Sequence, residues 1–338
     1  NAPIKLFINN QQKALASFSI EPNSSTEVEL SFTCKESGHQ QAKLQINDYP
    51  ISFDDSYFFS FEIAKKIAVL SINQDQENSA IQNLFKNDSS FYLQQVNEKS
   101  IDYSALSKNN LIVLNELQTI SSGLAQELNR FINNGGSLVL FPGIDIDMPS
   151  YRNFLSSLNS IYFTQLDTSK SRVDKINRLH PIYNDVFDKS KRIPESIDLP
   201  VVLAHYGFNQ NARTAVEYLM KLQNGDLFLS KIDYGKGQIY LCAVPLNVDF
   251  SNFTKHAMFV PTLYKIALFS IRQQKLFYTI GNNEQVLLGT TQLGADEVFH
   301  LKNTRGDFDL VPEHKVNESG TNLILHDQLK LADNYMLY

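Results

Sequence analysis

The stretch 111–143, LIVLNELQTISSGLAQELNRFINNGGSLVLFPG, decides the fold class of this chain. Its apolar run 111–114 predicts a strand covered on both faces. The run 121–134 has apolar residues at helical spacing, and Gly135-Gly136 predicts where this helix ends, because glycine tolerates the left-handed C-cap conformation. A second apolar strand follows at 137–141. A strand, a helix and a strand in this order predict a parallel sheet with right-handed crossovers.

The sequence on both sides of this stretch continues the α/β pattern. The apolar run 66–72 predicts another covered strand, and Asn78 or Ser79 can cap the helix that follows it. Further strands are expected at 91–96, 200–206, 214–222, 227–232 and 238–244. One helix is expected after Pro142-Gly143, carrying Phe154, Leu155 and Leu158, and another at 255–271. Since the strands after 200 are joined by short turns, we expect them to extend the sheet in antiparallel fashion.

The two ends of the chain have a different pattern, in which apolar and polar residues alternate. The alternation in 27–34 and 57–63 is typical of half-buried strands, and turn-forming residues separate the runs. Residues 1–63 are therefore expected to form an immunoglobulin-like β-sandwich. Residues 64–275 form the predicted doubly wound, flavodoxin-like α/β domain, and 276–338 a second β-domain, cut short within an apolar run at Tyr338.

Composition and charge exclude several classes of function. The net charge of -6 comes from acidic and basic residues that are interleaved along the chain, so no basic stripe is available for nucleic acid. The longest apolar candidate, 259–271, is shorter than the roughly 20 residues that span a bilayer. The two cysteines, Cys34 and Cys242, lie in different predicted domains and are expected to be free buried thiols.

Short motifs carry a resemblance to two known families. The stretch 111–143 resembles the middle of a class I glutamine amidotransferase-like domain, in which such a strand leads to the nucleophile elbow. The wider chain is similar to BatA-type (aerotolerance regulator-like) bacterial membrane proteins, through 54–61, His180-Pro181-Ile182-Tyr183, Tyr234-Gly235-Lys236-Gly237 and Phe259-Val260-Pro261. This resemblance implies membrane anchoring by helices outside this chain and a periplasmic location, and we expect the sequence to be an excised fragment.

The turn at the expected elbow lacks the chemistry of an amidotransferase. Such an enzyme needs a thiolate at the sharp turn after the strand, with a histidine and a carboxylate to activate it. Residues 142–147 read PGIDID and contain neither cysteine nor serine. Cys242 lies inside a predicted strand almost a hundred residues later. We therefore expect no catalytic residues and no enzymatic activity.

Four residues are candidates for ligand binding in the crevice at the carboxyl ends of the strands. Asp145 and Asp147 could supply oxygen ligands to Ca²⁺ or Mg²⁺, and they are also typical of a solvated turn. His180 and His205 could join Asp145 in a zinc-like site, although their spacing matches no ligand motif and both suit structural positions. We expect neither a metal nor a cofactor.

The sequence thus predicts a non-catalytic interaction module that docks other cell-envelope proteins on the periplasmic side of the bacterial inner membrane. The alternative is a ligand-binding or weakly hydrolytic domain that uses the strand-end crevice, where open α/β sheets usually bind ligands.

Overall fold

The computed structural model divides the chain into two compact units, 66–272 and the combination of 1–65 with 273–338. Whether the two terminal segments are also domains of their own stays a prediction. The structure describes residues 2–34, 36–50, 52–183, 186, 198–209, 215–271, 275–281, 285–288, 297–317 and 320–338. Residues 184–185 and 187–197, which include Pro194, lie outside the described residues.

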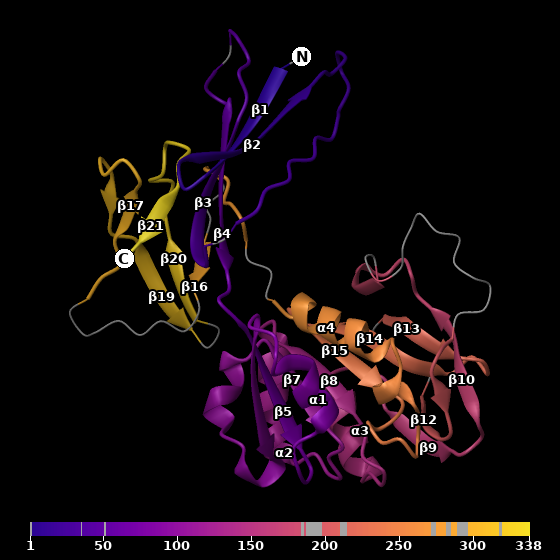
Figure 1. Cartoon of the computed structure of the whole chain (residues 1–338). Helices are drawn as coiled ribbons and strands as arrows, with labels where there is room; N and C mark the ends of the chain where they lie inside the picture. Colours follow the sequence, from indigo (N-terminus) through magenta and orange to yellow (C-terminus); the bar gives the residue numbers. More distant parts are fainter. Residues whose placement is uncertain are drawn as a thin grey trace. The chain divides into compact units, whose positions relative to one another are not determined.

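The larger unit is built on a nine-stranded sheet in the order β11-β10-β13-β14-β15-β8-β7-β5-β6 (Figure 1). Five neighbouring strands are parallel: β6 (Phe91–Asn97), β5 (Ile67–Asn73), β7 (Leu111–Asn115), β8 (Ser137–Phe141) and β15 (Gly237–Cys242). Numbered along the chain, these five strands have the spatial order 2-1-3-4-5, which is the flavodoxin-like order of doubly wound folds. The predicted α/β class is therefore confirmed.

Helices cover both faces of this sheet. Residues Leu111 and Val113 of β7 pack with α1 (Ser79–Phe85) and α4 (Phe259–Phe269), while Ile112 and Leu114 pack with α2 (Ser122–Asn133) and α3 (Met148–Ser157). Because successive side chains of a strand point to opposite faces, one apolar run supplies both layers of the core. All five residues of β7 are buried, as the sequence predicts.

The helix ends follow the expected capping chemistry. The Asn78 side chain accepts from the backbone N–H groups of Ala80 and Ile81 and so begins α1. Ser121 does the same for Leu124 at the start of α2. At the other end of α2, Gly135 has a φ of 98° and its N–H donates to the carbonyl of Ile132. Both predicted helices are confirmed, with bounds within one or two residues of those expected.

An antiparallel extension continues the sheet beyond β15. It contains β14 (Leu227–Tyr234), β13 (Val216–Leu222), β10 (Ser171–Ile176) and β11 (Val201–Val202). The expected hairpin between β14 and β15 is present, but β15 also pairs in parallel with β8. A separate two-stranded sheet joins β9 (Phe163–Asp167) to β12 (His205–Phe208).

The described residues of the smaller unit form three antiparallel sheets. The N-terminal segment forms one four-stranded sheet, β2-β1-β3-β4, from β1 (Ala2–Ile8), β2 (Gln11–Phe18), β3 (Gly38–Gln45) and β4 (Ser56–Ile63). The prediction of a strand at 27–34 is wrong, because this run forms no strand. Alternation shows which side chains can share a face, but a strand also needs a pairing partner, which this run lacks among the described residues. The described residues thus form only one sheet here. The expected immunoglobulin-like sandwich, which needs two, is not confirmed.

The C-terminal segment adds two three-stranded sheets. One is β16 (Gln285–Leu288), β20 (Gly320–Ile324) and β19 (Glu313–Asn317), and the other is β18 (Asp309–Leu310), β17 (Leu301–Asn303) and β21 (Tyr335–Leu337). Within this unit the N–H of Ser60 donates to the carbonyl oxygen of Leu276 at 2.8 Å. The alternating runs 297–301, 308–311 and 323–325 predict strands in this segment, and β17, β18 and β20 overlap them, although 297–300 form no strand.

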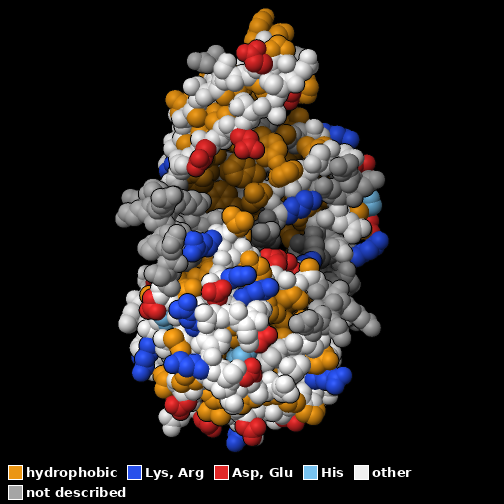
Figure 2. Space-filling model, turned by 90° about the vertical axis from the view of Figure 1, so that its right-hand side faces the viewer, with side chains coloured by type: hydrophobic (Ala, Val, Ile, Leu, Met, Phe, Trp, Pro, Cys, Tyr) orange, Lys and Arg blue, Asp and Glu red, His pale blue; other side chains and the backbone are white. Residues whose placement is uncertain are grey.

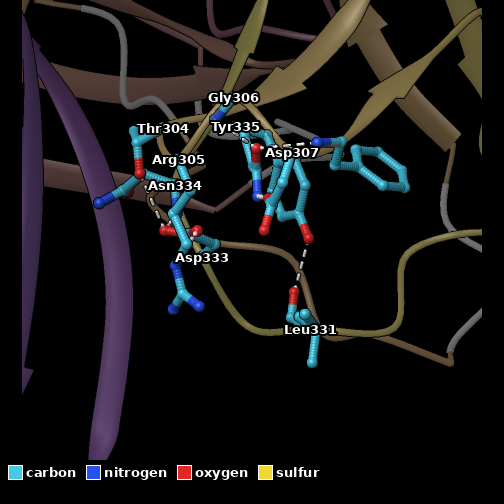
Figure 3. A network of polar contacts seen from close by, with 10 residues as sticks. Thr304, Arg305, Gly306, Asp307, Leu331, Asp333, Asn334 and Tyr335 are labelled. Carbon is cyan, nitrogen blue, oxygen red and sulfur yellow. Dashed lines mark hydrogen bonds and ion pairs between the residues drawn. The ribbon is translucent and has the colours of Figure 1, made fainter.

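A polar network fixes the turn after β17 to the segment before β21 (Figure 3). The Asp333 carboxylate accepts from the Thr304 hydroxyl at 3.2 Å and lies 3.4 Å from the Arg305 guanidinium. The Asp333 side chain is only 7% exposed, so it depends on these partners. Asn303 closes the turn itself, because its Oδ1 accepts from the N–H of Gly306.

Candidate functional site

The switch point of the larger sheet is the natural place for a site. After β5 the chain crosses to β6 on one side, and it later returns to β7 on the other side of β5. The connections at the carboxyl ends of β5 and β7 therefore diverge, and open α/β sheets usually bind ligands at such a point. Here β5 ends at Asn73 and β7 ends at Asn115.

Buried amide side chains meet at this switch point. Asn115 Nδ2 donates to Asn73 Oδ1 at 3.0 Å, and the Ser71 hydroxyl donates to the same oxygen at 3.1 Å. Asn73 Nδ2 reaches Gln95 Oε1 at 3.3 Å. Asn115 Oδ1 is buried and has no hydrogen-bond partner in the described part of the chain. An unpaired buried acceptor costs about 1–3 kcal/mol, so this oxygen suits a donor group from water or a ligand.

Glu116, directly after β7, brings a half-buried carboxyl group to the same edge. Its backbone has a φ of 59°, a conformation that L-residues rarely adopt. Burial raises the pKa of the Glu116 carboxyl, the N–H of Leu246 lowers it and the charge of Asp75 raises it. A carboxyl group with a raised pKa beside a crevice is a frequent feature of functional sites. The switch point is thus rich in hydrogen-bond acceptors.

The loop 142–147 follows β8 at this edge and carries two of the predicted site residues. Asp147 is the N-cap of α3, and its carboxylate accepts from the N–H of Ser150 at 3.1 Å. Asp145 is exposed. Six residues separate β8 from α3, and none of them has a left-handed backbone. This loop is therefore a capped connection without the sharp strand-to-helix turn of a nucleophile elbow.

Gly143 is required in this loop for a steric reason. A Cβ atom at this position would lie 3.0 Å from the carbonyl oxygen of Glu116 and 3.1 Å from that of Leu117. The backbone after β8 therefore passes close to the backbone after β7, as in many turns where glycine permits close approach.

Cys242 lies within β15 and is fully buried. Burial raises the pKa of its thiol to about 12, against the smaller lowering effect of the backbone N–H groups of Val244 and Ala243. The thiolate is the nucleophilic form of cysteine, and it is negligible at neutral pH with such a pKa. Cys242 therefore cannot replace the nucleophile that 142–147 lacks.

His180 is held at the beginning of β13. Its ring is buried, with Nε2 3.4 Å from the Glu217 carboxylate, and its Nδ1 accepts from the N–H of Ile182 at 3.2 Å. Desolvation lowers the pKa of His180, and the opposing effect of Glu217 is smaller. A neutral, hydrogen-bonded ring of this kind has a structural role in ordering the segment around Pro181.

His205 lies beyond the other end of β13. Its ring is fully buried, and Nε2 lies 3.0 Å from Oδ2 of Asp226, in the turn between β13 and β14. Glu217 and Leu222 are near the two ends of β13, about 17 Å apart at roughly 3.3 Å per residue. The two histidines therefore belong to different sites, and the four predicted residues do not converge.

The structure does bring together a group that the sequence did not predict. Asp167, His205 and Asp226 each place one possible ligand atom within 4.8 Å of the others. They come from β9, β12 and the turn after β13, so no local spacing could have identified them. The sequence analysis also did not predict the polar residues of the switch point, Asn73, Asn115 and Glu116. Their position at or directly after the end of an apolar strand is the signal that could have identified them.

Comparisons with known proteins find similarity in structure alone. No family model and no curated protein matches the sequence. A Salmonella typhimurium protein described as cytoplasmic is similar to 61% of this chain and 99% of its own (12% identity, TM-score 0.48). A ThuA-like protein from Bacteroides uniformis is similar over 64% and 96% (17% identity, TM-score 0.46). A β-galactosidase from Bacillus circulans sp. alkalophilus is similar over 76% and 41% (12% identity, TM-score 0.42).

These likenesses are weak in both sequence and geometry, so the fold assignment rests on the strand order given above. The described residues contain no helix that is both long and apolar enough to cross a membrane.

Proposed function

We propose that this chain is a non-catalytic interaction module that docks other proteins of the bacterial cell envelope. The observation that supports the docking role is a pair of aromatic side chains in the loop between β3 and β4: Tyr49 is 95% exposed and Phe53 is 89% exposed. Large aromatic residues supply much of the energy of protein interfaces, and so complete an exposure is unfavourable without a partner.

An aromatic row next to this loop supports the same role. Tyr57, Phe59 and Phe61 alternate along β4 and therefore lie on one face of the sheet, with ring centroids 6.4 and 6.2 Å apart. The ring of Phe32 lies at the end of the row, tilted against that of Phe61 with centroids 6.2 Å apart. The Tyr57 side chain remains 45% exposed. Figure 2 shows hydrophobic side chains gathered on this unit, in the upper part of the view.

The lack of catalysis is part of the proposal. The loop 142–147 has no nucleophile, Asp147 is engaged as a helix cap, and burial keeps the Cys242 thiol protonated. The resemblance to BatA-type proteins supports a periplasmic location and an anchor in the inner membrane. Fusing the full-length protein to an alkaline phosphatase tests the location, since this enzyme is active only outside the cytoplasm.

The docking role can be tested by photo-crosslinking in cells. We replace Tyr49 by p-benzoylphenylalanine in the full-length protein and use the same replacement at Tyr103, an exposed tyrosine of the other unit, as the control. The expected result is a discrete adduct with one envelope protein from position 49, lost on Phe53→Ser. Equal adducts at 49 and 103, or an adduct that is unaffected by Phe53→Ser, would contradict the proposal.

The unpartnered Oδ1 of Asn115 favours a second candidate function, the binding of a small donor-rich ligand such as a polyol or an amine at the switch point. Side-chain amide NMR signals of Asn73 and Asn115 report on this site directly. A ligand there shifts both signals and leaves that of Asn209, which lies after β12, unchanged. If no polyol or amine shifts the Asn115 signal, the crevice does not bind this class of ligand.

A further inference from the structure

Three side chains from distant parts of the chain meet beside the antiparallel extension of the larger sheet. Asp167 ends β9, His205 begins β12, and Asp226 lies in the turn between β13 and β14. Their possible ligand atoms lie within 4.8 Å of one another. The His205 ring is fully buried, whereas the Asp226 side chain is 44% exposed. The group therefore has a rigid inner side and an outer side that solvent and ions can reach.

The strand register holds two members of the group on the same face. His205 is the direct partner of Asp167 in the antiparallel pair of β12 with β9. Residues opposite each other in such a pair have Cβ atoms about 4.5–5.5 Å apart and project to the same side of the sheet. The imidazole and the carboxylate are consequently directed to one place by the backbone itself.

The third member is fixed by its turn. The N–H of Asp226 donates to Asn224 Oδ1 at 3.1 Å, and Asn224 Nδ2 donates back to Asp226 Oδ2 at 2.7 Å. Asp167 is oriented in a similar way, because its Oδ1 accepts from the N–H of Ser169 at 2.8 Å and from the Ser169 hydroxyl at 2.6 Å. Hydrogen bonds of this kind orient the carboxylates that bind metals in proteins.

The distances match the coordination sphere of a small divalent ion. Two ligand atoms about 2.1 Å from an ion lie about 3.0 Å apart at a right angle and about 3.4 Å apart at the tetrahedral angle that Zn²⁺ prefers. His205 Nε2 and Asp226 Oδ2 are 3.0 Å apart. The possible ligand atom of the partly exposed Asp167 lies within 4.8 Å of the other two.

The second nitrogen of His205 supplies an independent observation. Its Nδ1 is buried and has no hydrogen-bond partner among the residues that the structure describes. The hydrogen bond at one ring nitrogen sets the protonation of the other, so nothing on the Nδ1 side requires the proton to stay on Nε2. Nε2 can therefore present its lone pair toward the Asp226 carboxylate 3.0 Å away, where a bound cation would replace the proton.

We propose that Asp167, His205 and Asp226 form a binding site for one divalent transition-metal ion of the Zn²⁺ class. The imidazole ligand favours Zn²⁺ and Co²⁺ over Mg²⁺ and Ca²⁺, which prefer oxygen ligands alone. The two carboxylates balance the charge of the ion. Three protein ligands leave at least one position for water. The site is separate from the docking surface around Tyr49 and from the switch point at Asn115.

The test uses the whole chain, freed of metal with a chelator and then titrated with Zn²⁺ and with Co²⁺. The matched variants are Asp167→Asn and Asp226→Asn, with Asp145→Asn as the control for an exposed aspartate outside the site. A substitution of the buried His205 could prevent folding, so the test uses the two carboxylate variants instead. Circular dichroism and urea unfolding confirm that each variant is folded.

We expect one equivalent of Zn²⁺ in the wild type and in Asp145→Asn, with affinity at least tenfold lower in both site variants. Co²⁺ bound by the wild type gives a visible d–d absorption band that both site variants lose. The metal should also raise the melting temperature of the wild type, because it binds only the folded state. Absence of stoichiometric binding, or equal affinity in all four proteins, overturns the proposal.

Discussion

The Tyr206 hydroxyl donates a hydrogen bond of 2.8 Å to the carbonyl oxygen of Ile144. Tyr206 belongs to β12, and Ile144 belongs to the loop 142–147 that follows β8. This bond therefore ties the small two-stranded sheet to the carboxyl edge of the parallel strands. Burial raises the pKa of the Tyr206 phenol, so the hydroxyl remains a donor throughout the neutral range.

Replacing Tyr206 by Phe removes this bond and keeps the ring in the core. We expect the free energy of unfolding to fall by about 0.5–1.5 kcal/mol, the usual net value of a hydrogen bond. Urea unfolding measures the change, and hydrogen exchange should be faster in 142–147. Tyr92→Phe, at an exposed position, is the control. An equal loss of stability in both variants would show that the bond to Ile144 contributes nothing specific.

Gly237→Ala tests how closely the β14–β15 turn approaches the end of α2. A Cβ atom at Gly237 would lie 2.2 Å from the carbonyl oxygen of Gly136 and 2.3 Å from that of Ile132. The backbone must shift to relieve these contacts, so we expect a loss of about 1–3 kcal/mol or more.

The matched control is Gly123→Ala in α2, where a Cβ atom meets nothing within 4 Å. Alanine is a better helix former than glycine, so this variant should gain up to about 1 kcal/mol. Thermal or urea unfolding of the two variants should therefore show changes of opposite sign. The same sign in both would contradict the close approach at Gly237.

The two cysteines should differ in reactivity. Cys242 is fully buried and its pKa is raised to about 12, whereas Cys34 is half-buried. At neutral pH we expect a thiol reagent to label Cys34 in the native chain and to leave Cys242 unlabelled. Mass spectrometry of the labelled peptides gives the answer, with both residues labelled in denaturant. Labelling of Cys242 in the native chain would contradict its burial.

Glu116 should make stability depend on pH in a defined direction. Its pKa is raised on folding, chiefly by burial. A raised folded pKa favours the protonated form, so the stability from this group is fully present below the unfolded pKa and is lost as pH rises through the folded pKa. The glutamine in Glu116→Gln stays neutral at every pH. The change in the free energy of unfolding caused by this substitution should therefore be more favourable at pH 7 than near pH 4.

Urea unfolding of wild type and Glu116→Gln at both pH values measures this difference. The same substitution at Glu127, on the outer face of α2, serves as the control for a carboxylate with an exposed ion pair to Arg130. A pH-independent effect of Glu116→Gln would mean that burial does not govern this carboxyl group.

The sequence was most informative where one short run of residues determines its own environment. The strand 111–115 is apolar at every position except Asn115, and such runs occur where helices cover both sheet faces. The end of α2 was predictable because Gly135 must adopt a positive φ. The strands β5, β6, β7 and β8, the start of α1 and both ends of α2 were therefore predicted to within one or two residues, whereas β15 was expected only in the antiparallel extension.

The candidate sites depend on contacts that no local pattern encodes. His205 faces Asp167 only because β12 pairs with β9 across almost forty residues, and Asp226 joins them through a later turn. The segment 27–34 shows the opposite error, since its alternation predicts a strand that forms no ladder. An alternating pattern states which side chains can share a face, but pairing depends on a partner elsewhere in the chain.

The smaller unit combines residues 1–65 with residues 273–338, and the larger unit lies between them in the sequence. This arrangement has a consequence for synthesis on the ribosome. The central α/β unit can complete its sheet before residues 273–338 are translated, while the first four strands must wait for that later segment. The aromatic row of β4 is thus without part of its own unit throughout the synthesis of the α/β unit.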